Sequence, residues 1–236
     1  MEESGAIDIL RKSFNILMDD PGIIVLYALP AIVGMAMALH MGLRFGFSAM
    51  SGSFMGPSMI PSFLEMTSLI LIYAIIGMIV SVIVMAGAIL KVDASNNNTS
   101  IDLGEALSRG IGYFVPLVLS NIIVMLIVMF GFILLIIPGL YFALKTALFA
   151  PACVLETKNI GCIRRSWDLT KGRVWKIVAI ILIIVIASIL LSFIPIIGSL
   201  LVALIISPIQ IISMTLIYLE AREAETGSGL VMPQLE

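Results

Sequence analysis

Lys145 is the residue whose position most directly suggests chemistry, because it lies inside an apolar segment predicted to span a membrane, residues 140–155. A lysine at the centre of a span costs about 2.5–3.5 kcal/mol on insertion scales, and such charges usually face a partner or a water-filled path. Lys145 follows Gly139 of the preceding turn by only six residues, so its side chain can also reach the outer interface. Both interpretations remain open: a functional charge and a snorkelling lysine.

A second candidate is a group of basic and aromatic side chains in and after a short charged segment. Basic residues near a membrane surface attract anionic lipid by about 1 kcal/mol each, and tryptophan favours the head-group layer. The same charges also set membrane topology, so lipid contact is predicted and lipid specificity is not. The predicted lipid head-group residues are Arg164, Arg165, Lys171, Arg173, Lys176, Trp167 and Trp175.

Patterns for catalysis and metal binding are missing from the sequence. No predicted span pairs a nucleophile with a base, and the single histidine, His40, has only Arg44 and Glu65 as companions for an external mouth. Cys153 and Cys162 lack the spacing of a metal site. The fifteen methionines favour adaptable packing over a soft-metal path, since no paired His or Cys accompanies them. We therefore expect no catalytic residue, no metal and no cofactor.

The amino-acid composition indicates whether the folded chain is surrounded by water or by lipid. Hydrophobic residues make up 61% and charged residues 12% of the 236, against about 45–50% and 25% in soluble domains, and the mean hydropathy is +1.18. The net charge of −2 supplies no basic face for nucleic acid. The sequence therefore predicts an all-α integral membrane protein.

Hydrophobic runs and helical periodicity predict the elements that position these residues. Amphipathic helices are predicted over residues 1–20, 101–111 and 159–171, the second capped by Thr99 or Ser100 and the third stopped by Gly172. In the first, Ile7, Leu10, Phe14, Leu17 and Met18 form the apolar face. Residues 44–62 are predicted to form an external loop, with a short re-entrant or interfacial piece within it as the alternative. The six predicted spans are residues 23–43, 66–90, 113–137, 140–155, 174–194 and 199–219.

Proline spacing indicates an internal repeat. Pro138 and Pro151 are thirteen residues apart, as are Pro195 and Pro208, and each pair begins with an Ile-Pro turn. Each predicted hairpin also follows one amphipathic helix, so we predict three repeats of cytoplasmic amphipathic helix plus transmembrane hairpin. The repeats cover about 5–91, 100–156 and 159–222 of a single domain, 1–225, and residues 226–236 have the composition of a linker-like tail.

Small residues within the spans predict close helix packing, namely Gly34, Gly77, Ser81 and Gly87.

The distribution of charge predicts the topology of the chain in the membrane. If both termini and the polar connections share one side, eleven basic residues lie there and only Arg44 lies opposite, which places the termini in the cytoplasm. We therefore expect a multi-pass protein of the plasma membrane whose two cysteines stay reduced. The eleven are Arg11, Lys12, Lys91, Arg109, Lys158, Arg164, Arg165, Lys171, Arg173, Lys176 and Arg222.

Several short motifs carry a family resemblance. They are the run 137–139, Ala150-Pro151, Leu155-Glu156 and the run RRSWDLTKG at 164–172, and the likeness is strongest over residues 102–222. They resemble the membrane domain attached to some glycerophosphoryl diester phosphodiesterases and related stand-alone membrane proteins of unknown function. The chain has no room for the hydrolase barrel and lacks its metal-binding constellation. The resemblance thus implies a membrane module without the hydrolase.

Three functions follow as hypotheses. The first is a non-enzymatic membrane protein that binds or organises lipid or scaffolds partners, such as a second copy of the chain or another membrane protein. The second is a transporter or channel for a small solute, supported by Lys145 and by helices broken at Pro151 and Pro208. The third, an intramembrane lipid enzyme, requires acids or histidines that the predicted spans lack.

Overall fold

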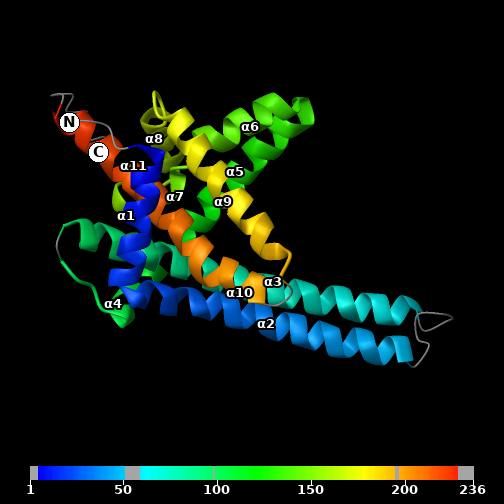
Figure 1. Ribbon diagram of the computed structural model, residues 1–236. Helices are drawn as coiled ribbons and strands as arrows, with labels where there is room; N and C mark the ends of the chain where they lie inside the picture. Colours follow the sequence, from blue (N-terminus) through cyan, green and yellow to red (C-terminus); the bar gives the residue numbers. More distant parts are fainter. Residues whose placement is uncertain (1–4, 51–58, 98, 195–196, 228–236) are drawn as a thin grey trace.

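The computed structural model describes residues 5–50, 59–97, 99–194 and 197–227, and the regular structure within these ranges is entirely helical (Figure 1). Six segments are long and apolar enough to span a membrane, which confirms the prediction of an all-α multi-pass membrane protein. They are Pro21–Arg44, Leu64–Asn96, Phe114–Leu134, Ile136–Leu155, Val174–Ser192 and Ile197–Thr226.

The helices form three hairpins connected by shorter helices. Helix α2 pairs with α3, α5 pairs with α6 followed by α7, and α9 pairs with the continuous segment α10, η1 and α11. The bounds are α1 Ala6–Asp19, α2 Pro21–Met50, α3 Met59–Asn96, α4 Leu103–Ile111, α5 Phe114–Leu134, α6 Ile136–Lys145, α7 Phe149–Leu155, α8 Gly161–Leu169, α9 Val174–Ser192, α10 Ile197–Leu201, η1 Val202–Ile206 and α11 Ser207–Gly227.

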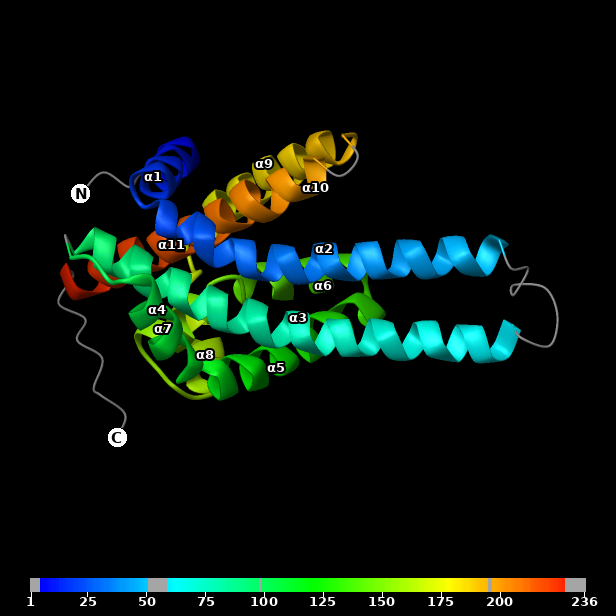
Figure 2. The same cartoon turned by 90° about the horizontal axis from the view of Figure 1, so that it is seen from below.

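The hairpins diverge from one common end of the molecule, which we call the base. Figures 1 and 2 show α1, α4, α7, α8 and the end of α11 gathered at the base, while the hairpin tips point away and α2–α3 projects furthest. Most of the buried core lies toward the base, where α1 packs on α11 and α9, and α7 packs on α8. Away from the base the hairpins expose Leu, Ile, Met and Phe side chains, as expected of surfaces in lipid.

Glycine allows the α5–α6 hairpin to close tightly. Leu135 is the one extended residue between the two helices. A Cβ atom added to Gly131 would lie 2.8 Å from the Gly139 Cα, and one added to Gly139 would lie 2.6 Å from the Phe132 ring. Only glycine permits this backbone approach, in line with the small residues that line helix contacts in membranes.

The two repeated prolines have different structural consequences. Pro151 lies in the first turn of α7, where a missing N–H is tolerated, and a turn over residues 146–148 separates α7 from α6. Pro208 instead follows the π-helical turn η1, in which the Ser207 amide donates to the Val202 carbonyl, so this helix widens and continues. The predicted helix break is therefore present before Pro151. At Pro208 the helix is continuous, so the prediction of a break there is wrong.

The first helix buries only part of its predicted apolar face, since Leu17 is buried and Leu10 is half-buried against the core. Its buried residues are Ile9, Ser13, Ile16 and Leu17, whereas Ile7, Phe14 and Met18 are exposed. The Ser13 hydroxyl lies 2.9 Å from the Ser213 hydroxyl of α11 in a buried contact. The helix thus has two apolar faces, one covered by protein and one open.

Helix α4 packs on α3 through small side chains. Its N-cap is Asp102, whose carboxylate accepts from the Gly104 amide, and not the predicted Thr99 or Ser100. Its buried residues are Ala106 and Gly110, and a Cβ on Gly110 would lie 2.8 Å from the Ile83 carbonyl oxygen of α3.

Three smaller predictions can also be compared with the structure. The predicted loop 44–62 is helical at both ends, because α2 continues to Met50 and α3 begins at Met59, and residues 51–58 lie outside the described ranges. Pro195 also lies outside them. Gly172 has φ +82°, but α8 already ends at Leu169 with Thr170 as its C-cap, so Gly172 lies in the turn that follows and the predicted helix stop at Gly172 is wrong.

Candidate functional site

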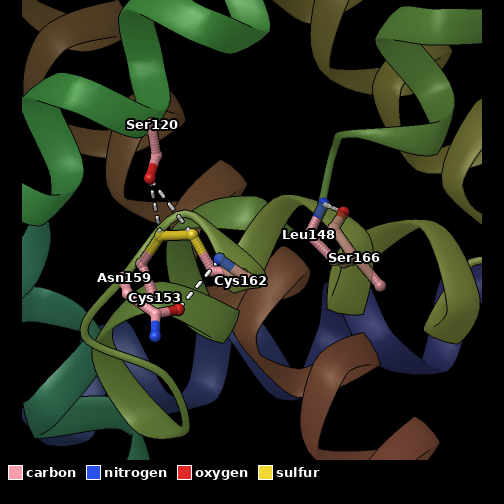
Figure 3. Close-up of a disulfide and its surroundings, with 7 residues drawn as sticks. Ser120, Leu148, Cys153, Asn159, Cys162 and Ser166 are labelled. Atoms are coloured by element: carbon pink, nitrogen blue, oxygen red, sulfur yellow. Dashed lines mark hydrogen bonds between the residues drawn. A yellow bond between two sulfur atoms is a disulfide. The ribbon is translucent and has the colours of Figure 1, made fainter.

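The break between α6 and α7 is held by two hydroxyl groups of α8. The Ser166 hydroxyl donates to the Lys145 carbonyl over 3.0 Å. It also accepts from the Leu148 amide over 3.1 Å (Figure 3). The Thr170 hydroxyl donates to the same carbonyl over 3.3 Å. These bonds satisfy backbone groups that the end of α6 leaves without helical partners. Helix α8 therefore fixes the position of Lys145.

The Lys145 side chain is buried, with 6% of its surface exposed. Its ammonium lies 5.8 Å from the centre of the Tyr141 ring, a cation–π contact. Trp167 of α8 packs edge-on against Tyr141 and also contacts Phe142. Among the described residues no carboxylate pairs with Lys145. The lysine is thus an enclosed cation in an aromatic setting and does not extend to an open surface.

Arg165 belongs to an ion-pair network within the protein. Its guanidinium lies 2.8 Å from Glu156 and 2.6 Å from Glu225, and 17% of the side chain is exposed. The Tyr218 hydroxyl donates to the same Glu156 carboxylate over 2.6 Å. Burial alone lowers the pKa of Arg165, yet the hydrogen bonds and charges of Glu225 and Glu156 outweigh burial and raise the pKa above its ordinary value. This arginine joins α7, α8 and α11.

The neighbouring Arg164 is exposed and has no ion-pair partner among the described residues. Asp168, four residues after Arg164 on α8, bonds Lys171 instead, over 2.8 Å. Lys171 itself remains largely exposed. These two cations therefore point away from the protein interior.

The other predicted head-group residues lie at the start of α9. Trp175 is 84% exposed, which suits a head-group contact. Lys176 lies 3.4 Å from Glu220 of α11 and Arg173 is half-buried, so both are partly covered by protein. The predicted group thus divides into an exposed set, Arg164, Lys171 and Trp175, and an enclosed set, Arg165, Trp167, Arg173 and Lys176.

The prediction that both cysteines stay reduced is wrong in the structure. Cys153 of α7 and Cys162 of α8 form a disulfide, with the Ser120 hydroxyl of α5 lying 3.2 Å from the Cys162 sulfur (Figure 3). The packing of α7 on α8 brings the two Cα atoms to 4.9 Å, within the range that a disulfide requires. The two cysteines are nine residues apart in sequence, and this separation alone does not indicate that they meet.

The predicted external mouth consists of contacts between two helices. His40 Nδ1 of α2 lies 3.2 Å from the Tyr73 hydroxyl of α3, and Arg44 lies 3.4 Å from Glu65. Both contacts join α2 to α3 toward the tip of the hairpin. In the described ranges, no three His, Cys, Asp or Glu residues gather in a way that could hold a metal ion.

One ion pair at the base was missed by the sequence analysis. The buried Lys91 of α3 lies 2.9 Å from Asp20, just before α2, and donates to the Ile101 carbonyl over 2.8 Å. It therefore ties the first hairpin to the segment that leads into α4. The Asp-Pro junction and Lys91 are seventy residues apart in sequence, and no periodicity links them.

Comparison of the chain with protein-family models, with curated protein sequences and with solved structures finds no match in any of the three.

Proposed function

We propose that this chain is a non-enzymatic membrane protein that binds anionic lipid at its base, with the base in the cytoplasmic head-group layer of the plasma membrane. One observation carries the proposal: ten of the eleven basic residues predicted to share one side lie on helices or connections at the base, and the eleventh, Lys91, is buried there beside Asp20. Arg44 lies toward the opposite end, on α2. Such a distribution matches the positive-inside rule, with both termini in the cytoplasm. Disulfides are rare in the cytosol, but Cys153 and Cys162 are fully buried, which restricts the access of reducing thiols to their bond.

Exposed apolar side chains at the base support a lipid contact. Ile7, Phe14 and Met18 form the open face of α1, and Ile111 and Trp175 are also exposed near the starts of spanning helices. A helix that carries apolar and basic groups together can lie in the head-group layer with its apolar face in the acyl region. The short helices thus supply both parts of a lipid-binding surface.

We further propose that the three hairpins are repeats, each preceded by its amphipathic helix. Ser13, Ala106 and Ser166 are fully buried small residues of α1, α4 and α8. Each lies eight residues before the first residue of the following spanning helix, Pro21, Phe114 or Val174. The three small residues share both their position before the spanning helix and their complete burial, which supports a common origin of the three repeats.

Lipid retention tests the main proposal. Changing Arg164 and Lys171 together to glutamine removes two exposed charges, and at about 1 kcal/mol per basic residue we expect about 30-fold weaker retention of phosphatidylglycerol. Native mass spectrometry of the purified protein, titrated with phosphatidylglycerol, measures the loss. Arg44→Gln, at the opposite end, serves as the control and should retain lipid like the wild type. Unchanged retention in the double variant would reject a head-group role for these residues.

A second candidate function is passage of a small anion, which the enclosed, carboxylate-free Lys145 favours. The interrupted helix at this point resembles the discontinuous helices of transporters. If this function holds, liposomes containing the wild type pass chloride, and Lys145→Ala lowers the flux at least ten-fold while Arg44→Gln does not. Equal flux in wild type and Lys145→Ala, with both proteins monodisperse, would exclude this role for the lysine.

A further inference from the structure

An open groove lies between the start of α5 and the connection from α7 to α8. Its volume is about 500 Å³, within the roughly 300–1,000 Å³ of small-molecule sites. Its wall is mostly apolar and is formed by the start of α5 on one side and by the connection into α8 on the other. The lining residues are Val115, Pro116, Leu119, Lys158, Asn159, Ile160 and Gly161.

The polar end of the groove presents hydrogen-bond donors. The Lys158 ammonium lies 4.9 Å from the centre of the Tyr113 ring, a cation–π contact that restrains it beside the groove. Within the described ranges no carboxylate pairs with Lys158. The Asn159 side-chain oxygen already accepts from the Gly161 amide over 2.9 Å, which leaves its NH₂ group as a donor (Figure 3). A ligand here must therefore bring acceptor oxygens or negative charge.

The apolar end of the groove continues along a membrane-spanning helix. Val115 and Leu119 lie in the first turns of α5, and both are exposed. Ile160, the last residue of the connection and also exposed, supplies an apolar side chain on the other side of the groove. A ligand that satisfies the groove therefore combines an anionic head with an apolar chain, and the chain enters the hydrocarbon along α5.

We propose that this groove binds one molecule of anionic phospholipid. The phosphate oxygens accept from Lys158 and Asn159, and the first part of an acyl chain lies on Val115 and Leu119. This inference rests on the proposed function, because it assigns a specific seat to one of the lipids at the base. It differs from the exposed group of Arg164, Lys171 and Trp175 in having a shaped apolar wall.

Two variants at opposite ends of the groove test the proposal. Lys158→Gln removes the cation and should weaken phosphatidylglycerol binding about five-fold, as expected for one basic residue near the surface, while affecting phosphatidylcholine little. Leu119→Trp fills the apolar part of the groove and should remove one bound phosphatidylglycerol. Lys158→Arg should retain binding. Arg44→Gln is the control, an exposed basic residue toward the opposite end of the molecule that pairs with Glu65.

Native mass spectrometry with phosphatidylglycerol or phosphatidylcholine, added separately, counts the bound lipids in each variant. Loss of one phosphatidylglycerol in both Lys158→Gln and Leu119→Trp, with Arg44→Gln unchanged, supports the groove. Wild-type lipid counts in both variants overturn the groove while leaving the proposed function in place. A wild-type protein that retains no phosphatidylglycerol overturns both. Loss in Leu119→Trp alone, equal for the two lipids, overturns the role of the cation.

Discussion

Replacing Arg165 with glutamine is expected to lower the unfolding midpoint of the detergent-solubilised protein by about 4–8 °C. The change leaves the Glu156 and Glu225 carboxylates, each about one-third exposed, without the cation that both contact. Loss of one partner of a fully buried pair costs about 3–5 kcal/mol. Because the two glutamates are partly hydrated, we expect about 2 kcal/mol, which for a domain of this size gives that shift.

The adjacent arginine provides a matched control. Arg164→Gln alters the same charge one residue earlier on α8, but Arg164 is exposed and unpaired within the described part of the chain. We expect its unfolding midpoint to stay within about 1 °C of the wild type. Thermal unfolding followed by circular dichroism compares the three proteins. Equal midpoints for Arg165→Gln and wild type would show that the network contributes no stability.

Replacing Gly131 with alanine is expected to destabilise the α5–α6 hairpin by about 1–3 kcal/mol. The new methyl group would lie 2.8 Å from the Gly139 Cα and 2.6 Å from a carbon of the Phe142 ring, so the two helices must separate. Overpacking of this kind commonly costs that amount, and here one contact is backbone and cannot rotate away. The unfolding midpoint should fall accordingly, and the drop is measurable in the same thermal experiment.

Gly34→Ala tests whether the expected loss of stability in Gly131→Ala comes from close packing or from replacing any helical glycine. A Cβ on Gly34 of α2 meets no heavy atom within 4 Å. Alanine also favours the helix over glycine by about 0.8–1.0 kcal/mol, so this variant should be neutral or more stable. If Gly34→Ala and Gly131→Ala lose equal stability, close approach at the hairpin is not the cause.

The spans and the fold class were predictable because they depend on the length and composition of apolar runs. Small residues in the spans were a weaker guide to the places where helices pack closely. Gly87 does pack closely, since a Cβ there would lie 3.2 Å from the Ala106 carbonyl of α4, whereas Gly34 has open space. Sequence shows where a close approach is possible, but tertiary arrangement decides where it occurs.

The buried face of α1 shows why periodicity fails for short helices at a membrane surface. Ile7, Phe14 and Met18 and the buried group around Ile9 and Leu17 all satisfy helical spacing. In water only one apolar face of a helix needs cover, whereas here protein can cover one and lipid another. Hydrophobic pattern alone therefore cannot assign the protein side.

The types of residue at the candidate site could be predicted from the sequence, but the residues that they contact could not. Arg164 and Arg165 are adjacent in sequence, yet only Arg165 meets Glu156 and Glu225. Those contacts bring together α7, α8 and α11, whose arrangement no local pattern encodes. The disulfide between Cys153 and Cys162 was missed for the same reason, because it depends on how α7 packs on α8.

Native mass spectrometry of the wild-type protein, titrated with equal amounts of phosphatidylglycerol and phosphatidylcholine, tests the central claim most directly. A base that binds anionic lipid should retain a small, discrete number of phosphatidylglycerol molecules, at concentrations where phosphatidylcholine is lost on collisional activation. Equal retention of the two lipids, or none of either, would contradict lipid binding through the charges of the base.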